Sequence, residues 1–142
     1  MSEERLSIAD YPLAEKRRDI VRGKRGKDLD EITLEALLED RVTIEDLRIT
    51  AAALRQQAEI ARAAGRATLA ANFERGAELV DVPQDTIMRI YELLRPGRAQ
   101  SRDELLAMAR ELRNQYEAEG MAAFVEEAAT VYERRGLFKK RF

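Results

Sequence analysis

The sequence predicts an all-α fold, a single compact multi-helix domain preceded by an extended, charged N-terminal segment. Apolar residues recur at helical spacing almost throughout, and no stretch shows the alternation of β-branched and polar residues typical of a half-buried strand. The length of 142 residues suits one domain that buries about two thirds of its unfolded surface. We expect three parts: an N-terminal arm or loop over 1–28, a helical domain over 29–135 and a basic, aromatic tail over 136–142.

Charge dominates the N-terminal segment. Seven basic residues lie between Glu15 and Lys27, whereas Asp28 to Asp46 holds eight acidic residues against Arg41 alone. Because apolar periodicity is weak in the basic stretch, we expect it to be extended or loop-like. The two stretches carry opposite charge, so they should pair with each other or with a partner of reversed polarity.

Threonines mark the first helix starts. Thr33 can cap a short helix through Glu39, and Thr43 with Asp46 three residues later imitates a capping box for another short turn. Thr50 caps a longer helix that continues to about Ala64.

Gly65 stands at a natural position for ending that helix, and the next helix is expected over 66–80. Its apolar side consists of Leu69, Phe73, Ala77 and Val80. Gly76 lies inside it, where glycine costs a helix about 1 kcal/mol relative to alanine. It either permits close packing or is a tolerated local weakness.

Three further helices are expected over 82–95, 102–118 and 121–135. Pro83 suits a first turn, Pro96 a stop, and Ser101 with Glu104 forms a capping box. The expected apolar stripes are Ile87, Ile90, Tyr91 and Leu94, then Leu105, Ala109, Leu112 and Tyr116, then Met121, Phe124, Val125, Ala128, Val131 and Tyr132. The last arc is wider than one neighbouring helix requires, so this helix is either central to its own fold or partly committed to another subunit.

The composition excludes enzymes whose chemistry depends on histidine or cysteine side chains. The chain has no His and no Cys, which removes the commonest general base, the thiolate nucleophile and the usual ligands of zinc, haem iron and iron–sulfur clusters. Carboxylate acid/base sites and oxygen-ligated Ca²⁺ or Mg²⁺ remain open. No apolar run is long enough to span a bilayer and the start lacks the apolar core of a secretory signal, so we expect a cytoplasmic protein.

Two short motifs allow other functions. Gly23, Lys24, Arg25 and Gly26 have the form of the GXXG loop of KH domains, but no sheet is visible and a solvated basic loop is favoured. The tail sets Phe138 and Phe142 among basic residues, so it either fills a partner's pocket or is a frayed terminus. Two alternatives therefore stay open: an RNA-binding helical module that uses 16–27, and a free-standing homo-oligomeric helical protein.

Several strings, in this order, resemble the small (gamma) subunit of the adenosylcobalamin-dependent diol and glycerol dehydratases. They are DYPLA at 10–14, ITLEALL at 32–38, LRITAAALRQQAEIARAAGR at 47–66, AANFERGAEL at 70–79, VPQDTIMRIYELLRP at 82–96 and AAFVEEAATVYERR at 122–135. The resemblance covers nearly the whole chain from Asp10 onward. One departure is Gly76, where the family more usually carries alanine.

The resemblance implies a complex with two copies each of a large, a medium and a small subunit. Such a complex converts 1,2-diols or glycerol to aldehydes and water by a radical mechanism. In that family the large subunit holds the substrate and adenosylcobalamin lies between the large and medium subunits. The small subunit packs against the large one, so we expect no catalytic, cofactor-binding or metal-binding residue on this chain, and neither membrane nor nucleic acid as a partner.

The partner interface is expected at Tyr11, Pro12, Arg95 and Tyr132, because tyrosine and arginine dominate protein contacts. Only nine residues precede Asp10, which looks more like glycerol dehydratase than diol dehydratase, whose small subunits often carry a longer N-terminal extension implicated in packing into bacterial microcompartments. The resemblance implies that substrate choice resides in the large subunit. Propanediol or glycerol preference and encapsulation in a microcompartment are therefore both open at this point.

Overall fold

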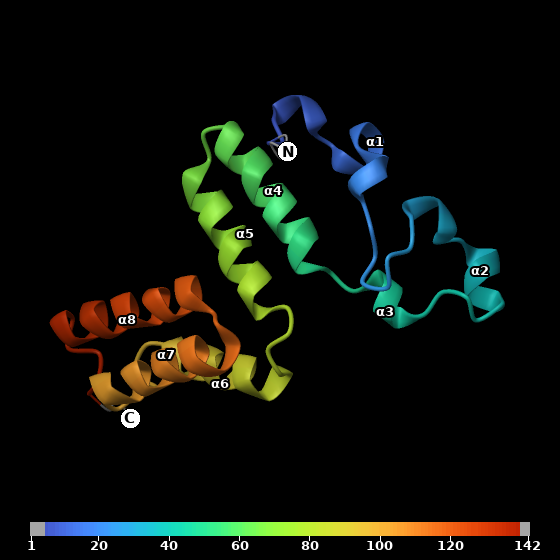
Figure 1. Ribbon diagram of the computed structural model, residues 1–142. Helices are drawn as coiled ribbons and strands as arrows, with labels where there is room; N and C mark the ends of the chain where they lie inside the picture. The colour runs from blue at the N-terminus through green and yellow to red at the C-terminus, as the bar shows by residue number, and fades with distance from the viewer. Residues whose placement is uncertain (1–4, 140–142) are drawn as a thin grey trace. The chain divides into compact units, whose positions relative to one another are not determined.

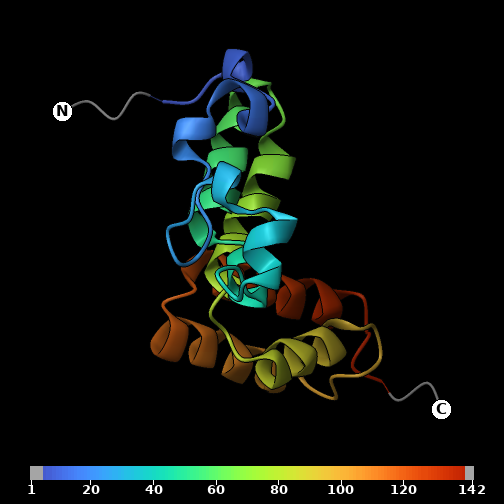
Figure 2. The same ribbon diagram turned by 90° about the vertical axis from the view of Figure 1, so that its right-hand side faces the viewer.

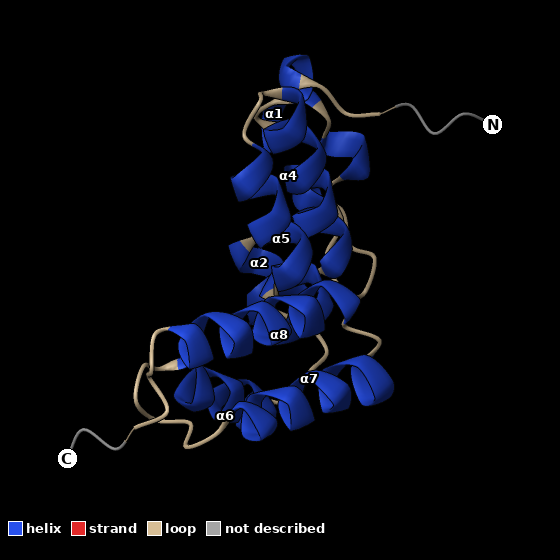
Figure 3. Ribbon diagram, turned by 90° about the vertical axis from the view of Figure 1, so that its left-hand side faces the viewer, coloured by secondary structure: helices blue, strands red, loops and turns tan. Residues whose placement is uncertain are grey.

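The computed structural model describes residues 5–139, which form two compact units that divide between Val80 and Asp81 (Figure 1). Regular structure in the described residues is helical, and the one β-type pairing found there is an isolated bridge between Arg22 and Asp28 (Figure 3). The predicted all-α class is confirmed. The predicted division into 1–28, 29–135 and 136–142 stays a prediction. In the predicted C-terminal tail, Lys140, Arg141 and Phe142 lie outside the described residues.

The first unit is built on a hairpin of α4 (Ala51–Ala63) and α5 (Ala67–Leu79), which lie side by side in both Figure 1 and Figure 2. Thr50 caps α4 as predicted, its hydroxyl accepting a hydrogen bond from the Ala53 amide at 3.0 Å. Gly65 has a φ of +74°, the left-handed conformation that ends a helix and favours glycine. Between the helices the buried side chains are small: Ala58, Ala61 and Ala70, with Leu69 and Phe73 packed against them.

Short helical turns precede the hairpin: η1 (Ile8–Asp10), α1 (Leu13–Lys16) and η2 (Arg18–Ile20). They bury Leu6 and Leu13 against Ile60 of α4. The prediction that residues 15–27 are extended or loop-like was therefore wrong for the part that forms α1 and η2. Each turn is closed by local hydrogen bonds and α1 buries a single apolar side chain, so no periodic stripe exists in the sequence to reveal it.

Two short helices, α2 (Leu34–Leu38) and α3 (Ile44–Leu47), follow another single turn, η3 (Leu29–Glu31). Thr33 caps α2 through the Ala36 amide at 3.1 Å, and Thr43 with Asp46 forms the predicted capping box of α3. Helices of four or five residues are not stable alone, so these caps and the contacts around them maintain both turns.

The second unit consists of α6 (Gln84–Leu94), α7 (Arg102–Tyr116) and α8 (Glu119–Arg134). α7 and α8 form a hairpin whose core includes the fully buried Leu105, Leu112 and Val125, all in predicted stripes. The predicted helix bounds agree to within two residues. The Ser101 hydroxyl does accept from the Glu104 amide, but the Glu104 carboxylate accepts from the Gln100 amide at 2.8 Å, one residue earlier than the predicted box requires.

Two predicted core positions are exposed. Tyr91 is 59% exposed, because α6 faces its neighbour with Thr86 and Ile90, and the next position along a helix points about 100° away. Phe124 is 39% exposed, since α8 turns Met121, Ala122, Val125 and Ala129 inward. Both corrections reflect helices that bury a narrower face than their apolar pattern suggests.

Candidate interaction surfaces

Oppositely charged stretches in the first unit pair with each other, one of the two predicted possibilities. Arg18 lies against Asp30 and Arg22 against Asp28, while the Nζ of Lys24 is 4.0 Å from a carboxylate oxygen of Glu45. These pairs are half-exposed to solvent, so each contributes little to stability by itself. Together they hold the basic loop against the acidic segment.

The centre of this contact is a buried carboxylate. The Asp46 side chain has no exposed surface and accepts hydrogen bonds from the Arg25 guanidinium, with an Nε–Oδ1 distance of 2.8 Å, and from the Thr43 amide at 2.9 Å. Arg25 also donates to the backbone oxygen of Arg41 at 3.0 Å. The Arg25 hydrogen bonds lower the pKa of Asp46 to about 2, because they stabilise its charged form.

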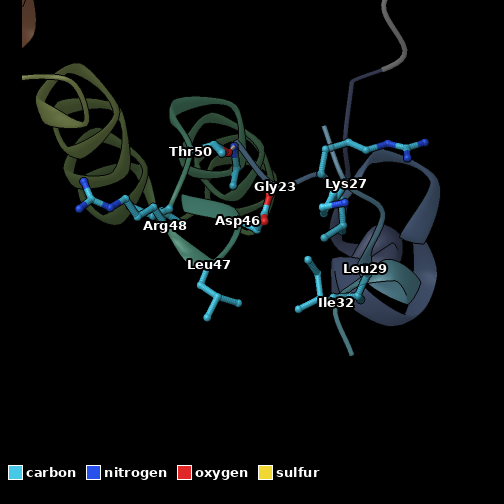
Figure 4. Close-up of a pocket in the computed structure, with 12 residues that line it drawn as sticks. Gly23, Lys27, Leu29, Ile32, Asp46, Leu47, Arg48 and Thr50 are labelled. Carbon is cyan, nitrogen blue, oxygen red and sulfur yellow. Dashed lines mark hydrogen bonds between the residues drawn. The ribbon is translucent and has the colours of Figure 1, made fainter. Parts of the chain in front are cut away.

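Gly23 lets the basic loop approach Asp46 closely. A Cβ on Gly23 would lie 3.0 Å from the Asp46 backbone oxygen, closer than real side-chain carbons normally come. Gly23 and Asp46 lie beside each other (Figure 4), and both line a cavity of about 300 Å³. The cavity is lined by aliphatic side chains such as Leu29 and Ile32, and also by the charged side chains Arg22, Lys27, Asp46 and Arg48.

The GXXG-like loop differs from a nucleic-acid clamp. Its two basic side chains, Lys24 and Arg25, are engaged by Glu45 and Asp46. The described residues also hold no sheet on which a KH domain would place such a loop. Both observations favour the solvated structural loop over the RNA-binding alternative.

Tyr11 and Pro12, two of the predicted interface residues, lie together in the first unit. The peptide bond between them is cis, and Tyr11 is 60% exposed. Tyr11 lines a second cavity of about 330 Å³ with Ile8 and Phe73. An exposed tyrosine beside an apolar hollow is suited to protein contact.

Arg95 and Tyr132, the other two, lie close to each other in the second unit. The Tyr132 hydroxyl donates to the backbone oxygen of Leu94, the residue before Arg95, and its ring packs edge-on to Phe138 at 6.3 Å. Arg95 is exposed and pairs with Glu92 at 2.9 Å. Tyr132 therefore has an intramolecular structural role, and the assignment of all four residues to an interface stays a prediction.

The sequence reasoning did not predict that large apolar side chains of α2, α3 and the residues just after α3 are exposed. They are Leu34, Leu37, Leu38, Ile44, Leu47 and Ile49. For α2 the signal was present, since leucines at i, i+3 and i+4 share one helix face. The pattern alone indicated burial, and only the structure shows that this face points outward.

Among residues 5–139, no group of three or more acidic side chains is placed to hold a metal ion. No helix in that range is long and apolar enough to cross a membrane. Several large apolar side chains are exposed, among them Tyr11, Leu34 and Leu38. The fold defines a class: a small all-helical protein with exposed apolar side chains available for contact with other molecules.

The particular family follows from comparison with known proteins. Residues 6–139 match the family described as "Dehydratase small subunit", and the chain belongs to that family. It is 52% identical over 132 residues to the propanediol dehydratase small subunit of Citrobacter freundii, and 51% identical over the same length to that of Salmonella typhimurium. Each alignment covers 93% of this chain and 76% of the relative. The resemblance derived from the sequence is thereby confirmed.

Proposed function

We propose that this protein is the non-catalytic small subunit of an adenosylcobalamin-dependent dehydratase that converts propanediol, related 1,2-diols or glycerol to aldehydes and water. The observation that carries the proposal is the 52% identity to a propanediol dehydratase small subunit over 93% of the chain. Both relatives are named for propanediol, which favours that substrate over glycerol.

The partners in this proposal are a large and a medium subunit, two copies of each joining two copies of this chain. Substrate is held by the large subunit, and this chain supports assembly. The absence of His and Cys supports such a role, because the chain lacks the side chains that most often carry catalysis. The complex would reside in the cytoplasm or within a bacterial microcompartment, which cell fractionation distinguishes.

Adenosylcobalamin is too large for either of the two cavities described above. The two described above measure about 300 and 330 Å³, the lower end of the range for small-molecule sites, whereas a corrinoid with its nucleotide is far larger than an ordinary ligand. Histidine, an axial ligand of many metallocofactors, is absent from the sequence. We therefore assign the cofactor to the other two subunits.

The test is reconstitution. The large and medium subunits from the same source are assayed for aldehyde formation from propanediol and from glycerol, with adenosylcobalamin, with and without this chain. The proposal expects full turnover and the complete assembly only when this chain is present. Equal turnover and equal assembly size without it would refute the role in assembly, and equal rates on both substrates would refute the preference for propanediol.

A further inference from the structure

Residues 22–49 form a segment of the first unit that buries few side chains. Only Ala36, Val42 and Asp46 of this segment are buried, and one of these three is charged. Neither α2 nor α3, the two α-helices of the segment, packs over several residues against another helix of the described part of the chain. Apolar burial, the main force that holds an element to its neighbours, is therefore small here.

A cavity lies where the segment meets the rest of its unit. It measures about 300 Å³ and is lined by Leu29 and Ile32 of the segment and by Thr50 and Ala53 at the start of α4. Side chains that face a cavity lack protein neighbours on one side, so they make fewer dispersion contacts than side chains in a close-packed core. The segment is thus loosely packed against the beginning of α4.

A charged side chain links the parts of the segment. The Arg25 guanidinium donates to the buried Asp46 carboxylate, with an Nε–Oδ1 distance of 2.8 Å, and to the Arg41 backbone oxygen at 3.0 Å. One side chain therefore joins the loop before α2 to the turn after α2 and to α3. Gly23 permits this approach, because a Cβ there would lie 3.0 Å from the Asp46 backbone oxygen.

The turn after α2 is in turn bound to that helix. Asp40 takes a left-handed φ of 57°, and the amides of Arg41 and Val42 donate to the Ala36 oxygen at 2.8 and 3.2 Å. Because Arg25 binds this turn and α3 at the same time, its release frees the loop, the turn and α3 together. The segment should therefore open as one cooperative unit.

The two helical hairpins are held differently, by apolar cores. α4 and α5 bury Ala58 and Ala70 with Phe73 packed against them, and α7 and α8 bury Leu112 and Val125. Unfolding of a hairpin exposes such a core to water. Opening of the segment exposes two apolar side chains of modest size and a carboxylate that gains hydration. The free-energy cost of opening is accordingly lower for the segment than for either hairpin.

We infer that residues 22–49 open as a unit while both hairpins stay folded, and that Arg25 is the residue that keeps the segment closed. Loss of Arg25 leaves the Asp46 carboxylate buried without its charged partner, an unfavourable state that opening relieves because water then solvates the carboxylate. The exposed pair of Arg18 and Asp30 adds a small, salt-screened attachment to η2. This conformational device belongs to the chain alone, so it holds or fails independently of the proposed function.

The experiment is native-state hydrogen exchange of the full chain, resolved to single amides, under conditions in which the rate reports the opening equilibrium. Four chains are compared: wild type, Arg25→Gln, Arg48→Gln and Leu112→Ala. Arg48 is the matched control, since it is a more exposed arginine paired with Glu45. Leu112→Ala destabilises the α7–α8 core without touching the segment.

The amides of Arg41 and Val42 report on the segment, and amides in the middle of α4, α5, α7 and α8 report on the hairpins. In wild type the segment amides should exchange at least about tenfold faster than the hairpin amides. Low concentrations of urea should speed their exchange less, because local opening exposes less surface than unfolding of a hairpin does.

The variants separate local opening from global unfolding. Leu112→Ala should speed exchange in α7 and α8 by at least about thirtyfold and leave the segment amides unchanged. Arg25→Gln should speed exchange of the segment amides by at least about tenfold, whereas Arg48→Gln should leave them as in wild type.

Two results would overturn the inference. Segment amides that exchange as slowly as the hairpin amides, with the same urea dependence, would show that the segment opens only when the protein unfolds. Equal effects of Arg25→Gln and Arg48→Gln on the segment amides would show that Arg25 does not keep it closed. Should Leu112→Ala fail to fold, the urea dependence in wild type decides between local and global opening.

Discussion

Replacement of Gly76 by alanine should stabilise the protein. Gly76 lies inside α5, where alanine is favoured over glycine by about 1 kcal/mol. The added Cβ would lie 3.6 Å from Leu54 Cδ1, an ordinary contact distance, and would gain about 0.1–0.2 kcal/mol of dispersion energy without displacing anything. We expect the free energy of unfolding to rise by about 1 kcal/mol.

The measurement is urea unfolding of the full chain followed by far-ultraviolet circular dichroism, with a thermal midpoint expected to rise by about 2–8 °C. Gly23→Ala is the matched control, since the same added methyl would lie 3.0 Å from the Asp46 backbone oxygen and should destabilise. A Gly76→Ala variant less stable than wild type, or two variants that shift in the same direction, would refute the reasoning from local geometry.

Three further predictions concern a buried leucine, an ion pair and a hydrogen bond. Leu112→Ala should lower the free energy of unfolding by about 2–5 kcal/mol, because this fully buried side chain would leave a cavity in the α7–α8 core. Arg25 lowers the pKa of Asp46 to about 2 from an ordinary 3.8. Their pairing therefore stabilises the folded state fully above about pH 4, and this stabilisation is lost as the pH falls toward 2. Arg25→Gln should move the acid unfolding transition, followed by circular dichroism, to higher pH. Tyr132→Phe should cost about 0.5–1.5 kcal/mol by removing the hydrogen bond to the end of α6, whereas Tyr91→Phe on the exposed face should change urea unfolding little.

Each of these three predictions has a control variant and a result that would contradict it. The control for Leu112→Ala is Met88→Ala, at a half-exposed site. If both variants lowered the free energy of unfolding equally, burial would not determine the size of the destabilisation. For the acid transition, Arg48→Gln removes a more exposed arginine paired with Glu45, and an equal shift would show that the effect is one of general charge. If Tyr132→Phe and Tyr91→Phe lowered the free energy of unfolding equally, the hydrogen bond of the Tyr132 hydroxyl would not be what stabilises the fold.

Much of the fold was predictable because its determinants are local. Thr33, Thr43 and Thr50 each cap the helix that the sequence indicated, and Gly65 ends α4 in the left-handed conformation. These signals act over three or four residues, so they can be read without knowledge of distant parts of the chain. The turns of α1 and η2 were missed because they bury too few residues to produce a periodic pattern.

The predicted interface residues stay a prediction. Residue type suggested Tyr11, Pro12, Arg95 and Tyr132, but the structure ties Tyr132 to its own chain through Leu94. The pairing of the basic and acidic stretches was one of two open possibilities, and the Arg25–Asp46 contact joins residues 21 positions apart. Such partners depend on where the loop lies in space, which spacing along the sequence does not reveal.

By itself, the sequence determined the helical class, the starts of α2 to α8 to within two residues, and the family, because caps, periodicity and family motifs are properties of neighbouring residues. Only the tertiary structure decided which apolar faces lie inside. The leucines of α2 have the spacing of a buried stripe, yet Ala36 is the side chain that packs inward. An apolar pattern indicates that a helix face is favourably buried. The packing of the whole unit determines whether that face is buried within the same chain or is left exposed for a partner.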